Sequence, residues 1–123
     1  EKALVVSSDT DEISISSETR VIEIDGKGVR EYAVTPEKFG LTRSKIDSIK
    51  VSNADESAEK ILSVLSGKKG PERDIVLLNA GAAIYVSGIV PSLDKGILLA
   101  AKSIDSGSAM KKLEALKSFA VES

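Results

Sequence analysis

The chain has 123 residues, with 17 Lys and Arg against 19 Asp and Glu, and it contains neither His nor Cys. This length allows one ordinary domain, and the missing side chains exclude disulfides, zinc and iron–sulfur sites, Cys nucleophiles and His-dependent triads. A net charge of −2 and only two Tyr and two Phe argue against a nucleic-acid surface, which needs clustered positive charge and stacking rings.

Strand signals are confined to the first 51 residues. Apolar runs or alternating apolar and polar residues predict strands at residues 3–6, 13–16, 21–24 and 29–34. The run at 3–6 has no polar residue and therefore predicts a buried strand. Residues 25–28 have the sequence Asp-Gly-Lys-Gly, which is typical of a tight turn. The last two strands are therefore predicted to form a hairpin. Residues 35–40 then predict a single helical turn that ends at Gly40.

Beyond residue 53 the apolar period changes from two to 3.6, and four helices are predicted. Asn53 and Glu56 form a capping pair for the first helix, and Gly67 ends it. Residues 75–86 are apolar nearly all round but too short to span a bilayer, which predicts a core helix. The faces predicted to point inward in the other three helices are Ala58, Ile61, Leu62 and Leu65; Leu93, Ile97, Ala101 and Ile104; and Ala109, Leu113, Leu116 and Ala120.

Together these elements predict an α/β fold, a mixed β-sheet flanked by helices, because amphipathic helices need an apolar surface to cover. We expect a single domain over residues 1–123, strand-rich over 1–51 and helix-rich over 53–121. The chain starts at Glu1, without Met and close to a strand, which favours a piece of a longer protein. Because it has no signal segment and no Cys, the sequence favours a cytoplasmic location.

Three acidic residues, Asp9, Asp11 and Glu12, lie on a Ser- and Thr-rich loop between two predicted strands. Carboxylates at a strand end suit Mg²⁺, which takes one or two protein carboxylates together with substrate phosphates. An acidic loop of this kind is more often simply solvated. The residue pattern alone leaves both interpretations open and favours the second.

Asn79 and Gly81 lie within the apolar helix. A buried Asn must find hydrogen-bond partners, so we expect Asn79 to cap a neighbouring loop rather than to contact a ligand. Gly81 is predicted to be a packing residue, because helix propensity alone would favour Ala there. Gly26 and Gly28 are not followed by a helix, so they predict the hairpin turn and not a phosphate-binding loop.

Three basic residues, Lys68, Lys69 and Arg73, surround the start of that same helix. The helix dipole would favour an anion there. A solvated connector explains the three charges equally well.

Six short motifs are distributed along the chain: Asp-Glu-Ile-Ser at 11–14, Thr-Arg-Val at 19–21, Thr-Pro-Glu-Lys-Phe-Gly-Leu at 35–41, the run Asp-Ile-Val-Leu-Leu-Asn-Ala-Gly-Ala-Ala at 74–83, Ile-Asp-Ser-Gly at 104–107 and Lys-Leu-Glu at 112–114. In these motifs, in their order and in their spacing, the sequence resembles the carboxy-terminal part of anthranilate phosphoribosyltransferase. The resemblance covers nearly the whole chain.

The resemblance implies part of the α/β catalytic domain, with the nucleoside phosphorylase and phosphoribosyltransferase type of fold. The family's reaction transfers phosphoribosyl from phosphoribosyl pyrophosphate to anthranilate in tryptophan biosynthesis, and its metal is Mg²⁺. The family's acidic pair, which holds the metal on the pyrophosphate side, corresponds to Asp11 and Glu12. No catalytic residue is assigned to this chain, and the intact enzyme is expected to be a homodimer that binds neither nucleic acid nor membrane.

Several motifs of the family have no counterpart here: its Gly-Thr-Gly-Gly-Asp loop, its Lys-His-Gly-Asn segment and its helical domain. They would lie in a missing amino-terminal part, so the chain by itself is expected to be inactive. Residues 7–10 form a shorter approach to the acidic pair than in the family and contain no glycine. Two alternatives remain: a related pyrimidine nucleoside phosphorylase, or a non-catalytic remnant that serves as an interaction module and exposes an apolar surface.

Overall fold

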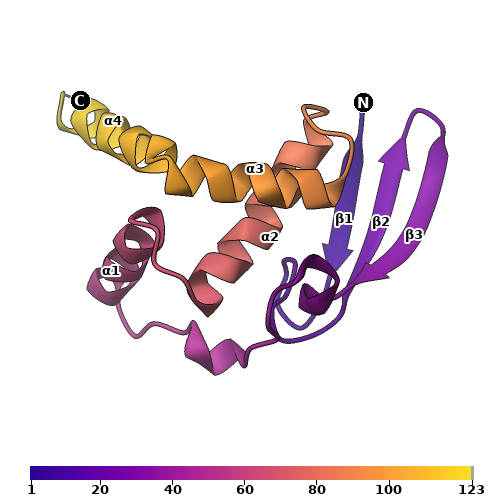
Figure 1. Cartoon of the computed structure of the whole chain (residues 1–123), viewed down its shortest axis with the longest axis horizontal. Helices are drawn as coiled ribbons and strands as arrows, with labels where there is room; N and C mark the ends of the chain where they lie inside the picture. The colour runs from indigo at the N-terminus through magenta and orange to yellow at the C-terminus, as the bar shows by residue number, and fades with distance from the viewer. Residues whose placement is uncertain (123) are drawn as a thin grey trace.

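The structure, a computed structural model, describes residues 1–122. Three strands come first along the chain: β1 (Ala3–Ser7), β2 (Thr19–Asp25) and β3 (Gly28–Val34). Two short 3-10 turns follow, at Pro36–Phe39 and Ile46–Ser48. Four helices complete the chain: α1 (Ala54–Leu65), α2 (Pro71–Val86), α3 (Leu93–Asp105) and α4 (Ser108–Glu122) (Figure 1).

The three strands form one sheet in the order β1-β2-β3, and both pairings are antiparallel. The predicted hairpin is confirmed: Asp25 pairs with Gly28, and the Lys27 N–H donates to Oδ1 of Asp25 at 2.7 Å. The α/β class is confirmed as well, although the described sheet is antiparallel throughout where a mixed sheet was expected. A parallel pairing requires a long crossover, usually a helix, whereas a loop without a helix joins β1 to β2.

Two strand predictions need correction. Strand β1 forms where predicted, but it lies at a sheet edge and Val5 is 54% exposed, so it is not buried. Residues 13–16 form no strand, although Ile13 and Ile15 are buried. The backbone N–H of Ser14 donates to Oγ1 of Thr19 at 2.9 Å, so a side chain takes the place of a strand partner.

Helices α2 and α3 pack against each other at two glycines. A Cβ atom at Gly96 would lie 2.2 Å from the carbonyl oxygen of Gly81, and one at Gly81 would lie 2.6 Å from Cγ1 of Ile97. Gly81 is therefore a packing residue, as predicted. At the start of α2, the buried guanidinium of Arg73 pairs with Asp105 at the end of α3, with both N···O distances at 2.9 Å.

A buried carboxylate joins the sheet to α2. Glu23 of β2 is 2% exposed and accepts hydrogen bonds from Tyr85 of α2 at 2.6 Å and from Tyr32 of β3 at 3.1 Å. Arg30 and Lys2 lie 3.0 and 3.7 Å from its Oε1 atom. Burial alone would raise the pKa of Glu23, but the hydrogen bonds from Tyr85, Tyr32 and Arg30 outweigh burial and lower that pKa.

The predicted cap of α1 is confirmed, because the Asn53 side chain accepts from the Glu56 N–H at 2.9 Å. The inward face predicted for this helix is wrong: Ile61 and Leu62 are exposed, and Val64 is the residue of α1 that is buried. The two helices α1 and α4 lie on the side of the α2–α3 pair that faces away from the sheet (Figure 1).

The face predicted for α3 is confirmed, whereas the face predicted for α4 is confirmed only in its first half, where Ala109 packs against the core and Leu113 is half-buried. In α3, Leu93, Ile97 and Ile104 are buried as predicted. In α4 the predicted inward residues Leu116 and Ala120 are exposed, because no described element covers that side of the helix. Over residues 1–122, no helix combines the length and apolar character that a membrane crossing requires.

Candidate functional site

The loop between β1 and β2 carries the acidic pair, and side-chain hydrogen bonds within the loop shape it. The Ser8 hydroxyl donates to the carbonyl oxygen of Glu12 at 2.7 Å. The Ser14 hydroxyl accepts from the backbone N–H groups of Ser16 and Ser17 at 3.0 and 3.2 Å. Hydroxyl groups that form hydrogen bonds with nearby backbone groups compete with regular secondary structure. This explains why these residues form a loop of defined conformation instead of a strand.

Asp9 is engaged within this loop. Its carboxylate accepts hydrogen bonds from the hydroxyls of Ser16 and Ser17, the second at 2.7 Å. Hydroxyl hydrogen bonds from Ser14, Ser16 and Ser17 stabilise the charged form and lower the pKa of Asp9 to about 2. Because both of its carboxylate oxygens already have partners in the loop, Asp9 stabilises the conformation of the loop.

Asp11 and Glu12 differ from Asp9. Both are exposed, and within residues 1–122 neither carboxylate makes an ion pair or a side-chain hydrogen bond. Glu12 lies at a groove of about 310 Å³ lined by the segment around Ile49 and Val51, by α1 and by the first half of α2. The two carboxylates are thus adjacent in the chain and available to an external ligand.

The carboxylates of Asp11 and Glu12 can supply only part of the coordination shell of Mg²⁺. Within the described part of the chain, no three acidic residues come close enough to form an all-protein metal site. Mg²⁺ accepts one or two carboxylates and completes its octahedron with water or substrate phosphate oxygens. Two unpaired carboxylates therefore match a metal that arrives with a phosphorylated substrate.

Asn79 reaches this loop from α2. Its Oδ1 accepts the Ile13 N–H at 2.9 Å, and its Nδ2 donates to the carbonyl oxygens of Ile13 and Ile75, both at 3.0 Å. The prediction that Asn79 caps a neighbouring loop is confirmed. The loop that it caps is the one that carries Asp11 and Glu12.

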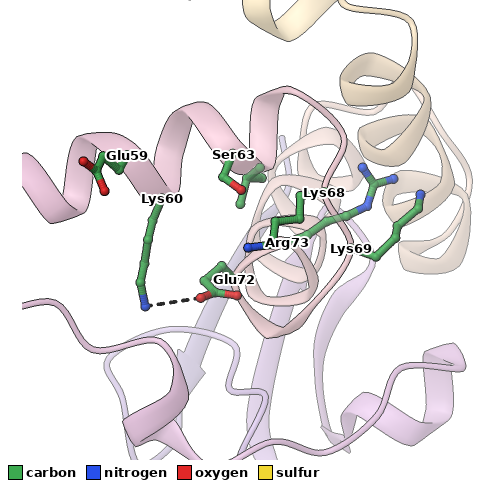
Figure 2. A pocket seen from close by; sticks show the side chains of 8 residues that line it. Glu59, Lys60, Ser63, Lys68, Lys69, Glu72 and Arg73 are labelled. Carbon is green, nitrogen blue, oxygen red and sulfur yellow. Dashed lines mark ion pairs between the residues drawn. The ribbon is translucent and has the colours of Figure 1, made fainter.

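The basic residues at the start of α2 do not converge. Lys69 and Arg73 are both paired with Asp105, at 3.7 and 2.9 Å. Lys68 lines a cavity of about 270 Å³ between α1 and α2, where Lys60 pairs with Glu72 at 3.2 Å (Figure 2). Because acidic partners take most of the positive charge, this region gives little support to an anion site.

Sequence reasoning missed the contacts around Glu23. The sequence nevertheless contained a signal for these contacts. In a period-two strand pattern, Glu23 lies on the same face as Val21 and Thr19. A carboxylate on a buried face must find hydrogen-bond or charge partners. The contact between Ser8 and the carbonyl of Glu12 was also missed. That contact had no sequence signal, since a Ser in an irregular loop has many alternative partners.

This chain belongs to the glycosyl transferase family, a/b domain, whose family model matches residues 1–110. Within that family, its resemblance to anthranilate phosphoribosyltransferases is confirmed. One from Methylobacillus flagellatus is 57% identical over 107 residues, which make up 87% of this chain and 31% of that protein.

Solved structures agree with the sequence comparison. The crystal structure of anthranilate phosphoribosyltransferase from Thermus thermophilus matches 93% of this chain and 34% of its own, with a TM-score of 0.83 and 40% identity. The enzyme from Saccharomyces cerevisiae in complex with PRPP and Mg matches 90% of this chain and 33% of its own, with a TM-score of 0.73 and 29% identity. The chain thus spans about a third of the length of the relatives it matches.

Proposed function

We propose that this chain is the carboxy-terminal part of the α/β domain of an anthranilate phosphoribosyltransferase. The complete enzyme would transfer phosphoribosyl from phosphoribosyl pyrophosphate to the amine of anthranilate, a step of tryptophan biosynthesis in the cytoplasm. Family membership and the 57% identity to an enzyme of that name support this proposal. A homodimer is proposed for the complete enzyme on the family resemblance.

The observation that carries the proposal is the pair of exposed, unpaired carboxylates of Asp11 and Glu12 on a loop held by side-chain hydrogen bonds. We propose that these two residues bind Mg²⁺. The similar yeast structure is a complex with PRPP and Mg, which supports Mg²⁺ as the metal. Bound Mg²⁺ would neutralise negative charge that develops on the pyrophosphate leaving group.

The chain's own residues would contribute electrostatics and orientation to this reaction. Asp11 and Glu12 supply two negative charges for the metal, and the loop backbone sets their spacing. The serine hydroxyls that engage Asp9 keep that third carboxylate from competing for the metal. Neither Asp11 nor Glu12 is required here to accept or donate a proton.

A test of the metal assignment replaces both carboxylates in the complete enzyme. We expect Asp11→Ala with Glu12→Ala to weaken the dependence of turnover on Mg²⁺ and to raise the Mg²⁺ concentration that gives half-maximal activity. Glu18→Ala is the matched control, since Glu18 is an exposed carboxylate on the same loop. Wild-type turnover by the double variant across a full Mg²⁺ titration would show that the assignment is wrong.

We further propose that the chain alone is inactive, because no part of its sequence resembles a glycine-rich loop that cradles pyrophosphate. Correct positioning of reactants supplies about 7–11 kcal/mol of a barrier, so the loss of the remaining binding groups leaves little catalysis. The assay follows the fluorescence of anthranilate with phosphoribosyl pyrophosphate and Mg²⁺, for the chain alone and for a mixture with the separately expressed remainder. Clear turnover by the chain alone would contradict this proposal.

One observation keeps a second candidate function open. Several large apolar side chains of α1, α3 and α4 are exposed, namely Ile61, Leu62, Leu98, Leu116 and Phe119. Exposed apolar side chains of this kind support contact with a further protein part, which would be the rest of the enzyme or, in a non-catalytic interaction module, another partner. Recovery of transferase activity on mixing with the remainder favours the enzyme, whereas binding without activity favours the module.

A further inference from the structure

The peptide bond that follows the acidic pair is held at both of its polar atoms. On one side, the carbonyl oxygen of Glu12 accepts from the Ser8 hydroxyl at 2.7 Å. On the other, the N–H of Ile13 donates to Oδ1 of Asn79 at 2.9 Å. The carbonyl oxygen of Ile13 is held too, because it accepts from Nδ2 of Asn79 at 3.0 Å.

Asn79 is itself fixed in orientation. Its Nδ2 also donates to the carbonyl oxygen of Ile75, one turn earlier in α2, at 3.0 Å. This third bond sets which way the amide faces, so that its oxygen meets an N–H and its nitrogen meets carbonyls. Two residues further along the helix, Gly81 lies in backbone contact with Ile97 and Gly96 of α3. The amide therefore projects from a helix that is in backbone contact with α3.

By contrast, nothing in residues 1–122 holds the carboxylates of Asp11 and Glu12 themselves. The positions of these two groups depend on the backbone that carries them. Metal sites lose affinity when the groups that orient the ligands are removed, by about 10- to 100-fold in measured cases. A backbone clamp beside two free carboxylates is suited to such an orienting role.

We propose that Asn79 is a positioning residue for the acidic pair: its amide fixes the Ile13 backbone so that Asp11 and Glu12 are presented together to a divalent cation. This inference rests on the proposed function, in which Asp11 and Glu12 bind the metal. The structural alternative is that Asn79 only satisfies buried backbone groups. The two interpretations differ in whether metal affinity changes more than stability does.

The test uses the complete enzyme with Asn79→Ala, which deletes the amide at a half-buried position in a helix that tolerates Ala well. Mn²⁺ binding is measured by electron paramagnetic resonance with phosphoribosyl pyrophosphate present, and stability by urea denaturation. We expect the Mn²⁺ affinity to fall by about tenfold or more. The Mg²⁺ concentration for half-maximal turnover should rise in parallel.

The matched control is Gly81→Ala, on the same helix but facing α3. A Cβ atom there would meet the backbone of Ile97 at 2.7 Å, so this variant loses stability without touching the loop. We expect it to keep Mn²⁺ affinity within about twofold. An Asn79→Ala enzyme that binds Mn²⁺ like the wild type, or a control that loses as much affinity, would overturn the proposal.

Two further variants separate the possible failures. If Asn79→Ala does not fold, the test uses Asn79→Asp. This variant keeps the acceptor for the Ile13 N–H and removes the hydrogen-bond donors to the carbonyl oxygens of Ile13 and Ile75. Wild-type Mn²⁺ affinity in Asn79→Asp would overturn the proposal. Asp11→Ala with Glu12→Ala tests the metal assignment directly. If this double variant keeps its Mn²⁺ affinity, the proposed metal site fails and the role of Asn79 fails with it. If only the double variant loses affinity, the metal site stands and the positioning role is wrong.

Discussion

The helices α2 and α3 bury most of their large apolar residues, whereas α1 and α4 leave most of theirs exposed. Ile97 of α3 is 6% exposed, and Ile61 of α1, equally apolar, is 51% exposed. Both residues occupy the apolar face of an amphipathic helix. The difference shows that an apolar stripe indicates which residues of a helix can be buried. Whether they are buried depends on the elements that pack against the helix.

This contrast also has a functional side. The packed pair α2–α3 supports the acidic loop through Asn79 and joins the sheet through Tyr85. Helices α1 and α4, which carry the exposed residues Ile61, Leu116 and Phe119, lie on the other side of that pair (Figure 1). The closely packed part of the chain thus coincides with the part that positions the candidate site, which agrees with sites being most exact on well-packed elements.

The largest effect is expected from overpacking the α2–α3 contact. Gly81→Leu should lower the free energy of unfolding by about 3 kcal/mol, at the upper end of typical overpacking costs, because even a Cβ atom would meet Ile97. Ala83→Leu adds a bulkier side chain on the exposed side of the same helix and should change stability by less than about 0.5 kcal/mol. If urea denaturation gave equal losses of unfolding free energy for the two variants, close packing at Gly81 would not be the cause of the loss.

The link between α2 and the sheet is tested by Tyr85→Phe. This variant removes the 2.6 Å hydrogen bond to the buried Glu23 carboxylate, which should cost about 1.5–3 kcal/mol, as expected for a bond to a charged group. Tyr32→Phe should cost less, because its bond to Glu23 is longer at 3.1 Å and Tyr32 is only partly buried. Thermal denaturation at pH 7 ranks the two variants, and the reverse order would contradict this account.

A third prediction uses pH to test the ion pair between α2 and α3. The Arg73 guanidinium lowers the pKa of Asp105 below its ordinary value of 3.8. A carboxyl group whose pKa is lower in the folded state stabilises the fold above its unfolded pKa and loses this contribution as pH falls through the folded value. Stability of Asp105→Asn should therefore fall less steeply than wild type below about pH 3.8.

The control for this pH experiment is Asp94→Asn, at the exposed start of α3. Asp94 has no ion pair within residues 1–122, so this variant removes a carboxylate from the same helix without breaking the pair with Arg73. Urea midpoints measured from pH 5 to pH 2 provide the comparison. Parallel curves for wild type and Asp105→Asn would show that the pair contributes nothing to the acid dependence.

The smallest effect is expected on the exposed face of α1. In the isolated chain, Ile61→Ser should change the free energy of unfolding by less than about 0.5 kcal/mol, because half of the side chain is already in water. Val64→Ser, at the buried position of the same helix, should cost at least about 1 kcal/mol. In the proposed complete enzyme the cost of Ile61→Ser should rise, and an unchanged cost there would mean that this face stays uncovered.

The sequence by itself determined the local structure and the family. Capping by Asn53, the turn at 25–28 and the period of 3.6 depend on groups a few residues apart, and the structure contains each of them. The resemblance also marked Asp11 and Glu12. Their role in binding metal stays a prediction, since their carboxylates have no partner in the described chain.

Only the tertiary structure decided which surfaces are covered and how the acidic loop is held. Ile13 is bonded to Asn79, 66 residues further along the chain, and Glu23 is bonded to Tyr85, 62 residues away. No local period encodes such pairings, because they depend on where whole helices lie relative to the sheet. For the same reason, residues 13–16 satisfy their backbone without a strand, and Ile61 stays exposed on a helix whose sequence predicts that it is buried.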